Sequence, residues 1–252
     1  MMQPLIIKLS GKTLADRDGL KTLFLRLSGR EVILVHGGGV EVDALLKRLD
    51  IVTPKKEGIR VSPAEAMPYI TGMLAGSCNR SLQALALEAG LNALGLCATD
   101  GRSLELVPYP QEYGQVAHVR AESADFLTAL LKNGYTPVIS SIGLSQGTTF
   151  NINADEVAVE LAALLKAPLL LVSDVPGVKD GSGRILEKLT RSEAETLIED
   201  RIITEGMVIK VRSALQSASR TGNMLVLTNL ERLTDPKLDL FSLRRLGTAF
   251  EA

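Results

Sequence analysis

Short apolar runs alternate with amphipathic helical patterns along nearly the whole chain, and this alternation limits the choice of fold more than any other feature. Helical spacing follows the first two runs, near residues 17–28 and across residues 40–50. Strands that alternate with helices predict a mainly parallel sheet with helices on both faces. In such sheets ligands bind beyond the carboxyl ends of the strands, so we look for functional residues there. The runs that predict buried strands are 5–9 (LIIKL), 31–39 (EVILVHGGG), 136–141 (TPVISS), 167–174 (APLLLVSD) and 224–229 (MLVLTN).

Composition narrows the class of protein further. The chain has 252 residues, of which 46% are hydrophobic and 23% charged, which suits one large α/β unit or two closely joined lobes. A net charge of −1 gives no electrostatic reason to expect nucleic acid or a membrane as partner. No apolar run has the length of a membrane span, and the N-terminal residues lack a signal-peptide pattern. Cys78 and Cys97 form no C-x-x-C pair and the histidines are only His36 and His118, so we expect no zinc site and a reduced, cytoplasmic protein.

The first predicted strand carries Lys8 at its end, and a second lysine follows in a glycine-containing segment. Gly11-Lys12-Thr13 is similar to the end of a P-loop, but a P-loop needs its first glycine at the position of Ile6. The apolar run before Gly11 also predicts a strand where a P-loop needs a loop. The alternative is a lysine at the carboxyl end of the strand, followed by a glycine turn. This alternative favours Lys8 as the residue that handles an anion.

The sequence HGGG, residues 36–39, ends the second predicted strand and opens a helix. Three glycines allow the backbone to approach a ligand and direct N–H groups at an anion, helped by the helix N-terminus. A tight turn with positive φ is the other interpretation, but one glycine is enough for that. The pattern is not G-x-G-x-x-G, and no acidic residue follows at the dinucleotide spacing, which argues against an NAD site. We therefore favour ligand binding at this turn.

Arg60 lies in EGIRVSP, directly before a predicted helix start. Ser62 and Glu65 match a capping box, with Pro63 at the first helical position. The guanidinium of Arg60 has the geometry to bind a carboxylate with two parallel hydrogen bonds. A solvated loop arginine is an equally good interpretation of this residue alone.

The sequence NINADE, residues 151–156, predicts another helix start. Asn153 and Glu156 form the capping pair, and Asn151 precedes the cap and is free to bind a ligand. Asp155 pairs with lysines or merely complements the helix dipole. Without family context both interpretations stay open.

The C-terminal third of the chain adds polar residues at strand and helix ends. Ser173 and Asp174 end a buried strand before a Pro-Gly turn, where a carboxylate contacts ligand or caps the turn. Lys210 is near the start of a helix, where a solvated lysine is the more common case. Ser192 with Glu195 predicts a further capping box.

The order of these motifs is more specific than any one of them. A lysine at the end of the first strand, GGG after the second, GIRVSP, NINADE, SDVPGV and EGMVIK together resemble the amino-acid kinase family over nearly the whole chain. ITGMLAGSCNRSL, residues 70–82, is also similar to that family's substrate-lobe helix, with Gly72, Gly76 and Asn79 in register. Within the family, the pattern is most similar to kinases that phosphorylate N-acetyl-L-glutamate.

The resemblance implies a fold and a reaction. The fold is a three-layer αβα sandwich with an open, mainly parallel sheet. Its N-terminal lobe, residues 1–167, binds the acyl substrate and dimerises, and its C-terminal lobe, residues 168–252, binds ATP. The reaction transfers the γ-phosphoryl group of MgATP to the side-chain carboxylate of N-acetyl-L-glutamate, a step of arginine biosynthesis. Mg²⁺ is then held mainly by the nucleotide phosphates, with no metal ligands from the protein.

The resemblance also implies roles for individual residues. Lys8 and Lys210 hold the transferring phosphoryl group from opposite sides, and Asp155 positions both lysines. Backbone N–H groups of three glycines contact the phosphoryl group and the substrate carboxylate, and these are Gly11, Gly38 and Gly39. The remaining assignments are Arg60 and Asn151 for the α-carboxylate of the substrate, and Ser173, Asp174 and Met207, with Gly11, for the nucleotide.

Three departures from the family pattern stand out. The family usually has Gly-Gly after the strand-end lysine, whereas this chain has Ser10-Gly11. Lys12, next in the chain, is unusual and near the nucleotide entrance, and we interpret it as a solvated surface charge. The stretch 101–120, which we predict to be a β-hairpin, matches the family poorly, so preference among acyl groups is less constrained than phosphoryl transfer.

Arginine-inhibited members of the family carry an extra N-terminal helix that joins dimers into hexamers. The first predicted strand here begins by about residue 4, so we expect a homodimer that is insensitive to arginine. Two alternatives stay open: a sister kinase acting on N-acetyl-aminoadipate, glutamate or another small anion, and a catalytically silent regulatory protein on the same fold. A Rossmann oxidoreductase is disfavoured because its fingerprint is absent.

Overall fold

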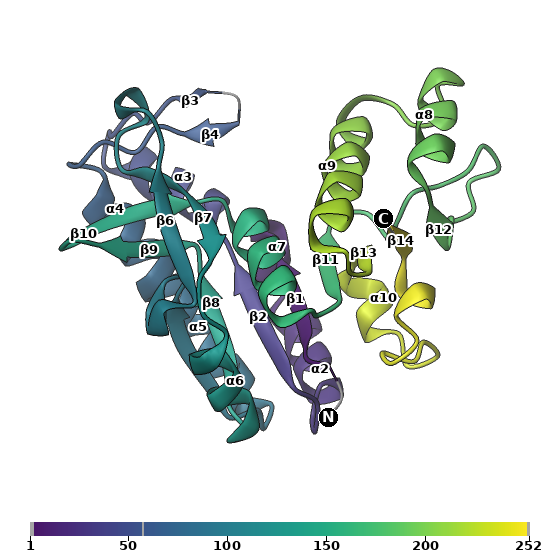
Figure 1. Cartoon of the computed structure of the whole chain (residues 1–252), viewed down its shortest axis with the longest axis horizontal. Helices are drawn as coiled ribbons and strands as arrows, with labels where there is room; N and C mark the ends of the chain where they lie inside the picture. The colour runs from purple at the N-terminus through teal and green to yellow at the C-terminus, as the bar shows by residue number, and fades with distance from the viewer. Residues whose placement is uncertain (1–2, 57, 251–252) are drawn as a thin grey trace.

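The computed structural model of the chain describes residues 3–56 and 58–250 (Figure 1). Its centre is an eight-stranded sheet in the order β12-β14-β13-β11-β1-β2-β8-β5. Neighbouring strands in this sheet are parallel except for β13 and β14, which confirms the predicted sheet type. The strands are β1 (Leu5–Leu9), β2 (Val32–His36), β5 (Ala93–Cys97), β8 (Thr136–Ser140), β11 (Leu169–Ser173), β12 (Lys188–Leu189), β13 (Leu225–Asn229) and β14 (Thr248–Phe250).

Helices cover both faces of the sheet and complete three layers (Figure 1). Side chains alternate across each strand, so Ile6 packs in one core cluster with Val157 and Val211, while Ile7 packs on the opposite face with Phe24. No helix in the described part of the chain has the length and apolar composition needed to cross a membrane. The helices are α1 (Gly11–Leu14), α2 (Arg17–Arg26), α3 (Gly39–Arg48), α4 (Met67–Thr71), the π-helix η1 (Gly72–Cys78), α5 (Asn79–Glu88), α6 (Asp125–Lys132), α7 (Ala154–Leu165), α8 (Arg191–Glu199), α9 (Glu205–Thr221) and α10 (Leu230–Thr234), with short 3₁₀ turns η2 (Asp100–Arg102), η3 (Gln111–Tyr113) and η4 (Leu243–Leu246).

A smaller sheet lies beside the first and includes the predicted hairpin. Its order is β6 (Leu104–Pro108), β7 (Val116–Ala121), β10 (Thr148–Ile152) and β9 (Ile142–Ser145). β6 and β7 pair antiparallel, which confirms the hairpin predicted within residues 101–120. The β9–β10 hairpin was not predicted. A third pairing joins β3 (Lys55–Lys56) to β4 (Ile59–Arg60).

The parallel strands bring distant segments together at one edge of the central sheet. Lys8 is in register with Leu171 of β11 and Val35 of β2. The carboxyl ends of β1, β2 and β11 therefore lie side by side, as the position of ligands in such sheets requires.

Helix α7 begins at this same edge. The side chain of Asn153 accepts a hydrogen bond from the N–H of Asp155 at 2.8 Å, which confirms the predicted N-cap. The predicted box partner, Glu156, instead accepts from the N–H of Val119 at 3.2 Å and lies beside His118. Helix α7 is thereby fixed against β7.

A buried carboxylate ties α7 to α9. Glu160 is 5% exposed, and its Oε2 accepts from the N–H of Ala121 at 3.0 Å. Its Oε1 lies 2.6 Å from the guanidinium of Arg220, near the end of α9. The helix that carries Asp155 is thus bound to the helix that carries Lys210.

The start of α8 differs from the prediction by two residues. Thr190, not Ser192, is the N-cap, and its Oγ1 accepts from the N–H of Glu193 at 3.4 Å. The carboxylate of Glu193 accepts in return from the N–H of Thr190 at 2.8 Å. Both Thr190–Glu193 and Ser192–Glu195 satisfy the sequence pattern, so the pattern alone did not select the correct pair.

We expect Thr190→Ala to lower the free energy of unfolding by about 1 kcal/mol, because it removes the cap of α8. Ser192→Ala, the matched control, is expected to change it by less than about 0.5 kcal/mol. Urea denaturation followed by circular dichroism measures both. A larger loss for Ser192→Ala would contradict the cap assignment.

Candidate active site

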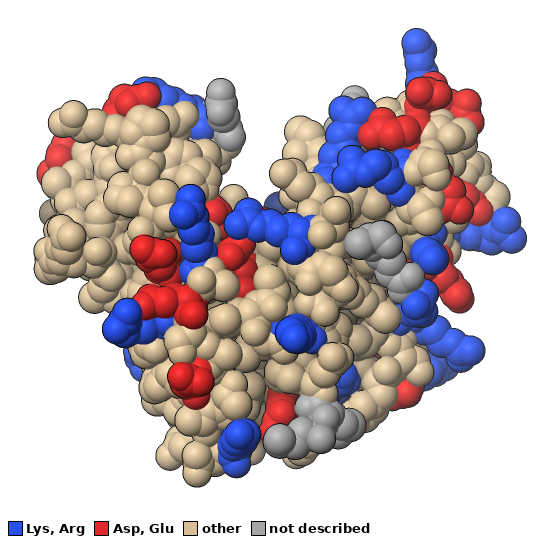
Figure 2. Space-filling view, in the orientation of Figure 1, with Lys and Arg blue, Asp and Glu red and all other residues tan. Residues whose placement is uncertain are grey.

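Two cavities open side by side at the carboxyl edge of the central sheet. The larger, which we call the lysine cavity, has a volume of about 470 Å³, and the smaller, the arginine cavity, has about 240 Å³. Gly39 and Lys55 line both, so the two cavities meet there. Figure 2 shows a notch between the two halves of the molecule with basic and acidic side chains close together on its floor. The charged residues of the lysine cavity are Lys8, Lys12, Lys55, Lys210, Asp43, Asp155 and Asp174.

The end of β1 and the start of α7 contribute an ion pair to the lysine cavity. Lys8 Nζ lies 2.8 Å from Asp155 Oδ1, and the side chain of Lys8 is only 14% exposed. The strand fixes the stem of Lys8, and the capped first turn of α7 fixes Asp155. The predicted contact between these two residues is therefore present.

Asp174, after β11, holds two lysines at once. Its Oδ1 lies 2.5 Å from Lys210 Nζ and its Oδ2 lies 3.1 Å from Lys12 Nζ. The hydroxyl of Ser173 also donates to Asp174 at 2.9 Å. Hydrogen bonds from Lys210, Lys12 and Ser173 together hold the pKa of Asp174 well below its usual range.

This arrangement differs from the predicted role of Asp155 as the partner of both lysines. Among the described residues, Asp155 pairs with Lys8, while Lys210 pairs with Asp174. Each of these two ammonium groups is thus neutralised by a different carboxylate. The sequence held no distance information that would separate the two aspartates as partners for Lys210.

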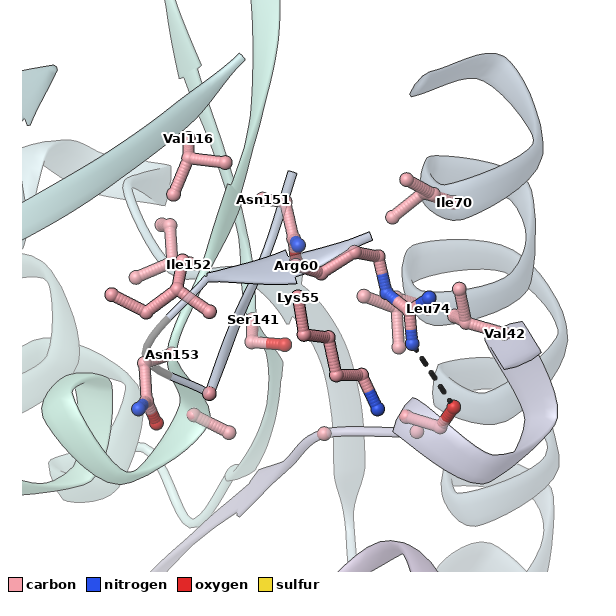
Figure 3. Close-up of a pocket in the computed structure, with 16 residues that line it drawn as sticks. Val42, Lys55, Arg60, Ile70, Leu74, Val116, Ser141, Asn151, Ile152 and Asn153 are labelled. Atoms are coloured by element: carbon pink, nitrogen blue, oxygen red, sulfur yellow. Dashed lines mark hydrogen bonds between the residues drawn. The ribbon is translucent and has the colours of Figure 1, made fainter. Parts of the chain in front are cut away.

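Arg60 enters the arginine cavity from the β3–β4 hairpin (Figure 3). Its side chain is 9% exposed and donates to Thr53 Oγ1 at 2.9 Å and to the carbonyl oxygen of Gly39 at 3.4 Å. It also pairs with Asp43, which Lys55 contacts at 3.1 Å. Burial opposes ionisation of Asp43, but the hydrogen bonds from Arg60 and Lys55 outweigh it and lower the pKa of this carboxyl group. Arg60 is therefore a fixed cation and not a solvated loop arginine.

Ser62 does not cap a helix. Its hydroxyl instead bonds two residues of the arginine cavity. The predicted capping box was wrong, because α4 begins at Met67 with Ala66 as its N-cap. The buried hydroxyl of Ser62 donates to the carbonyl oxygen of Arg60 at 3.0 Å and accepts from Asn151 Nδ2 at 3.1 Å. Ser62 thus joins the strand of Arg60 to Asn151, which lies on β10 and lines the same cavity.

The glycine turn lies between the two cavities. None of Gly37, Gly38 and Gly39 has φ in the left-handed region, so the turn itself does not require glycine. A side chain at Gly38 would come within 2.8 Å of Leu74, whereas one at Gly39 would meet nothing within 4 Å. A side chain at Gly38 would therefore have to displace the end of the Leu74 side chain, whereas Gly39, the first residue of α3, leaves open space at the junction of the cavities.

His36 supports this turn from inside the protein. Asn79 Nδ2 lies 3.0 Å from His36 Nε2 and donates to the carbonyl oxygen of Val138 at 2.8 Å. Because the amide nitrogen is a donor, Nε2 is the acceptor and Nδ1 donates to the carbonyl oxygen of Gly37 at 2.7 Å. Burial lowers the pKa of His36 to about 4. The imidazole is thus a neutral structural group.

We expect the neutral state of His36 to make stability depend on pH. The unfolded chain takes up this proton near the ordinary pKa of 6.5 and the folded chain only near 4, so the unfolded state binds more protons between these values. Stability therefore falls as the pH falls through this window, by about 2 kcal/mol between pH 7 and pH 5. Urea denaturation at both pH values measures the loss, and a His36→Gln variant with the same loss would contradict the assignment.

Not all of the residues that the resemblance assigns to nucleotide binding line the lysine cavity. Gly11, Ser173 and Asp174 line the lysine cavity. Met207 is not among the residues that line it and packs partly buried against the main core cluster. Its assignment to nucleotide therefore rests on the resemblance alone.

Three further residues of the site, Asp43, Lys55 and Thr53, were not predicted from the sequence. Asp43 follows the glycine turn by one helical turn on α3, and Lys55 is the cross-strand partner of Arg60. A charged residue one turn into a helix that opens at a ligand site was a usable signal for Asp43. The position of Lys55 depends on the β3–β4 pairing, which the sequence pattern did not reveal.

The two cavities provide places for two anions next to each other. β1 and α9 contribute lysines to the lysine cavity, β4 contributes Arg60 to the arginine cavity, and carboxylates pair with these cations. The thiol nearest the glycine turn belongs to Cys78, and burial, with the charge of Glu41, raises its pKa to about 11. This thiol is protonated at neutral pH and a poor nucleophile. The geometry suits transfer of a charged group between two bound molecules.

Comparison with known sequences places these features in a family. The sequence profile of the Amino acid kinase family matches residues 3–229. An acetylglutamate kinase of Proteus mirabilis (strain HI4320) is 42% identical over 254 residues, which cover 98% of this chain and 98% of the relative. An acetylglutamate kinase of Yersinia pestis (strain Pestoides F) is 44% identical over 229 residues, which cover 88% of this chain and 89% of the relative.

Solved structures agree with the fold. A Streptococcus mutans UA159 protein superposes with a TM-score of 0.78 at 25% identity, covering 99% of this chain and 98% of that one. An N-acetylglutamate synthase from Neisseria gonorrhoeae, complexed with coenzyme A and N-acetyl-glutamate, gives a TM-score of 0.80 at 20% identity, with 99% of this chain and 59% of that one covered. A carbamate kinase from Giardia lamblia bound to AMP-PNP gives 0.64 at 16% identity, with 99% and 98% covered. At these identities the last two similarities concern the fold alone.

Proposed function

The chain belongs to the amino acid kinase family, and we propose that it transfers the γ-phosphoryl group of MgATP to the side-chain carboxylate of N-acetyl-L-glutamate. The product is N-acetyl-L-glutamyl 5-phosphate, an intermediate of arginine biosynthesis. The observation that carries the proposal is the meeting of the lysine cavity and the arginine cavity at Gly39 and Lys55. A phosphate chain in the first and a dicarboxylate in the second bring the reacting groups together at that junction.

The reaction requires positioning and charge stabilisation more than proton transfer. A carboxylate is already a nucleophile at neutral pH, so no general base is needed. Phosphoryl transfer depends on bringing two anions into line and spreading the charge of the transition state. Lys8 and Lys210 are assigned to the transferring phosphoryl group, and Asp155 is assigned to hold Lys8. On nucleotide binding, Lys210 exchanges Asp174 for the phosphoryl group.

The arginine cavity is assigned to the acyl substrate. Arg60 takes the α-carboxylate with its guanidinium, and the amide of Asn151 completes that contact. Backbone N–H groups at Gly38 and Gly39 face the carboxylate that accepts the phosphoryl group. This assignment uses the contacts of Arg60 with Thr53 and of Asn151 with Ser62, which fix both groups before substrate arrives.

The lysine cavity is assigned to ATP, with Gly11, Ser173 and Asp174 among its contacts. Mg²⁺ would be held mainly by the nucleotide phosphates, because this ion usually takes its ligands from substrate phosphates and water. The carboxylates that line the lysine cavity, Asp43, Asp155 and Asp174, are each paired with a lysine of the chain. The metal would neutralise charge on the phosphates. In this division, residues 1–167 form the acyl-substrate lobe and residues 168–252 the ATP lobe, although Lys8, Gly11 and Asp155 of the first also face the nucleotide.

We further propose a homodimer in a reducing, cytoplasmic compartment. Both cysteines of the chain, Cys78 and Cys97, are free thiols in the structure. The dimer stays a prediction from the resemblance. Sedimentation at several protein concentrations measures the oligomeric state.

The test of function is ATP-dependent hydroxamate formation in hydroxylamine, which traps an acyl phosphate. N-acetylglutamate, N-acetyl-aminoadipate, glutamate and aspartate are compared at equal concentration. We expect strong preference for N-acetylglutamate. Preference for another acid would overturn the substrate while keeping the phosphoryl-transfer site. No activity with any acid, together with normal ATP binding, would favour a silent regulatory protein.

A further inference from the structure

Lys12 lines the lysine cavity, although its sequence position predicts a solvated surface charge. It lies in α1, four residues after Lys8, at the edge of the sheet where the strands end. Its ammonium reaches across to Asp174, 3.1 Å away, at the end of β11. The contact therefore joins two segments 162 residues apart in the chain, on the open side of the cavity.

Stability does not explain this contact. The side chain of Lys12 is 73% exposed and that of Asp174 is 42% exposed. An exposed ion pair of this kind contributes little to folding, because solvent screens it and two side chains lose freedom. Asp174 also has a closer partner in Lys210, at 2.5 Å. The significance of Lys12 is therefore its place in the cavity.

The charges of the cavity are unevenly distributed. Asp155 holds one lysine, whereas Asp174 is shared by Lys12 and Lys210. Among the residues that the structure describes, one positive charge beside Asp174 therefore has no carboxylate of its own. An anion that enters the cavity from solvent meets the exposed ammonium of Lys12 first. The low-dielectric walls of the cavity focus the electric field of this positive charge on the entering ligand.

We propose that Lys12 is a third phosphate-binding lysine, which contacts the β- and γ-phosphates of the nucleotide beside Lys210. The inference rests on the proposed function, because it requires ATP in the lysine cavity. Without nucleotide, Asp174 holds the ammonium of Lys12 over the cavity. When the phosphate chain binds, the four-carbon stem of the lysine lets the charge move from the carboxylate to the phosphates. Lys12 then adds affinity in proportion to the number of phosphates beyond the first.

Nucleotide binding without acyl substrate tests this role. Calorimetry measures the dissociation constants of AMP, ADP and a non-hydrolysable ATP analogue, each with Mg²⁺, for wild type, Lys12→Met and Lys12→Arg. Lys21→Met is the matched control, since Lys21 forms an exposed pair with Glu88, at 2.5 Å, on α2 away from the cavity. Each titration is repeated at high salt.

Lys12→Met is expected to raise the dissociation constants of ADP and the ATP analogue about 5- to 10-fold. The dissociation constant of AMP is expected to rise less than about 2-fold. High salt is expected to reduce the difference in affinity between wild type and Lys12→Met, because salt screens the exposed contact between Lys12 and the phosphates. Lys12→Arg is expected to retain most of the affinity, and Lys21→Met all of it.

Two results would overturn the role of Lys12 alone. Equal affinities for wild type and Lys12→Met would leave it a surface charge, and a uniform loss that includes AMP would make it a support for the cavity wall. Wild-type protein that binds none of the three nucleotides would instead overturn the proposed function, and the inference with it. A wild type that binds ATP but phosphorylates a different acid leaves the role of Lys12 intact.

Discussion

Replacing Lys8 by alanine is expected to lower kcat by about 10²–10³ while the protein stays folded, and Lys210→Ala is expected to have an effect of the same size. Each lysine is assigned to oxygens that gain negative charge as the phosphoryl group transfers. The side chain of Lys8 is only 14% exposed, so a contact of its ammonium group is worth more than it is in solvent. The loss is therefore comparable to that of a donor removed from an oxyanion hole.

The two variants each remove the lysine partner of a different carboxylate. Lys8→Ala removes the described partner of Asp155, whose charge then repels the phosphates. Lys210→Ala leaves Asp174 paired with Lys12. Within the range of about 10²–10³, we therefore expect Lys8→Ala to lie toward the upper end and Lys210→Ala toward the lower end. We also expect Asp155→Asn to cost little when added to Lys8→Ala, since residues that act as a pair are not additive.

Initial rates in the hydroxamate assay at saturating substrates give kcat, and thermal unfolding monitors the fold. Lys132→Ala on α6 is the control for loss of an exposed lysine away from both cavities. Tm is expected to stay within about 4 °C of wild type for all three variants. A kcat for Lys8→Ala or Lys210→Ala within a few-fold of wild type would remove that lysine from the reaction.

The strands that carry the site could be predicted well from the sequence, for physical reasons. Buried parallel strands are continuous apolar runs, so β1, β2, β8, β11 and β13 could be located, and their polar last residues pointed to the correct edge. Lys8 was favoured because it ends a buried strand before a glycine turn, whereas Asp155, at a predicted helix start, was assigned only through the family resemblance. Their contact follows from the topology of the sheet.

The sequence did not predict contacts that depend on short, irregular pairings. Ser62 matches a capping box in the sequence, but its backbone pairs with Gly114 in an isolated bridge. Its hydroxyl donates to the carbonyl oxygen of Arg60 and accepts from the amide of Asn151. Asp174 was expected at the nucleotide, but its hold on Lys12 and Lys210 depends on three segments that are distant in sequence. Propensity and periodicity describe local structure, and these contacts are tertiary.

Arg60→Ala is expected to raise KM for the acyl substrate about 10- to 100-fold, with a smaller change in kcat. The guanidinium is nearly buried, and Thr53 and the carbonyl oxygen of Gly39 fix it. Truncating one partner of a buried, hydrogen-bonded charge pair costs several kcal/mol, since the other charge is left without a partner. Arg60→Lys is expected to recover little, because an ammonium cannot bind a carboxylate with the same two parallel bonds.

The measurement that separates recognition from support is the comparison of two KM values. If Arg60 binds the α-carboxylate, KM for the acyl substrate rises while KM for MgATP stays near that of wild type. If Arg60 only holds the β3–β4 hairpin through Asp43, both KM values rise together, because Asp43 and Lys55 also line the lysine cavity. Arg48→Ala, on the exposed last turn of α3, is the control and is expected to change neither. An unchanged KM for the acyl substrate would remove Arg60 from the site and leave Asn151 as the principal polar contact of the arginine cavity.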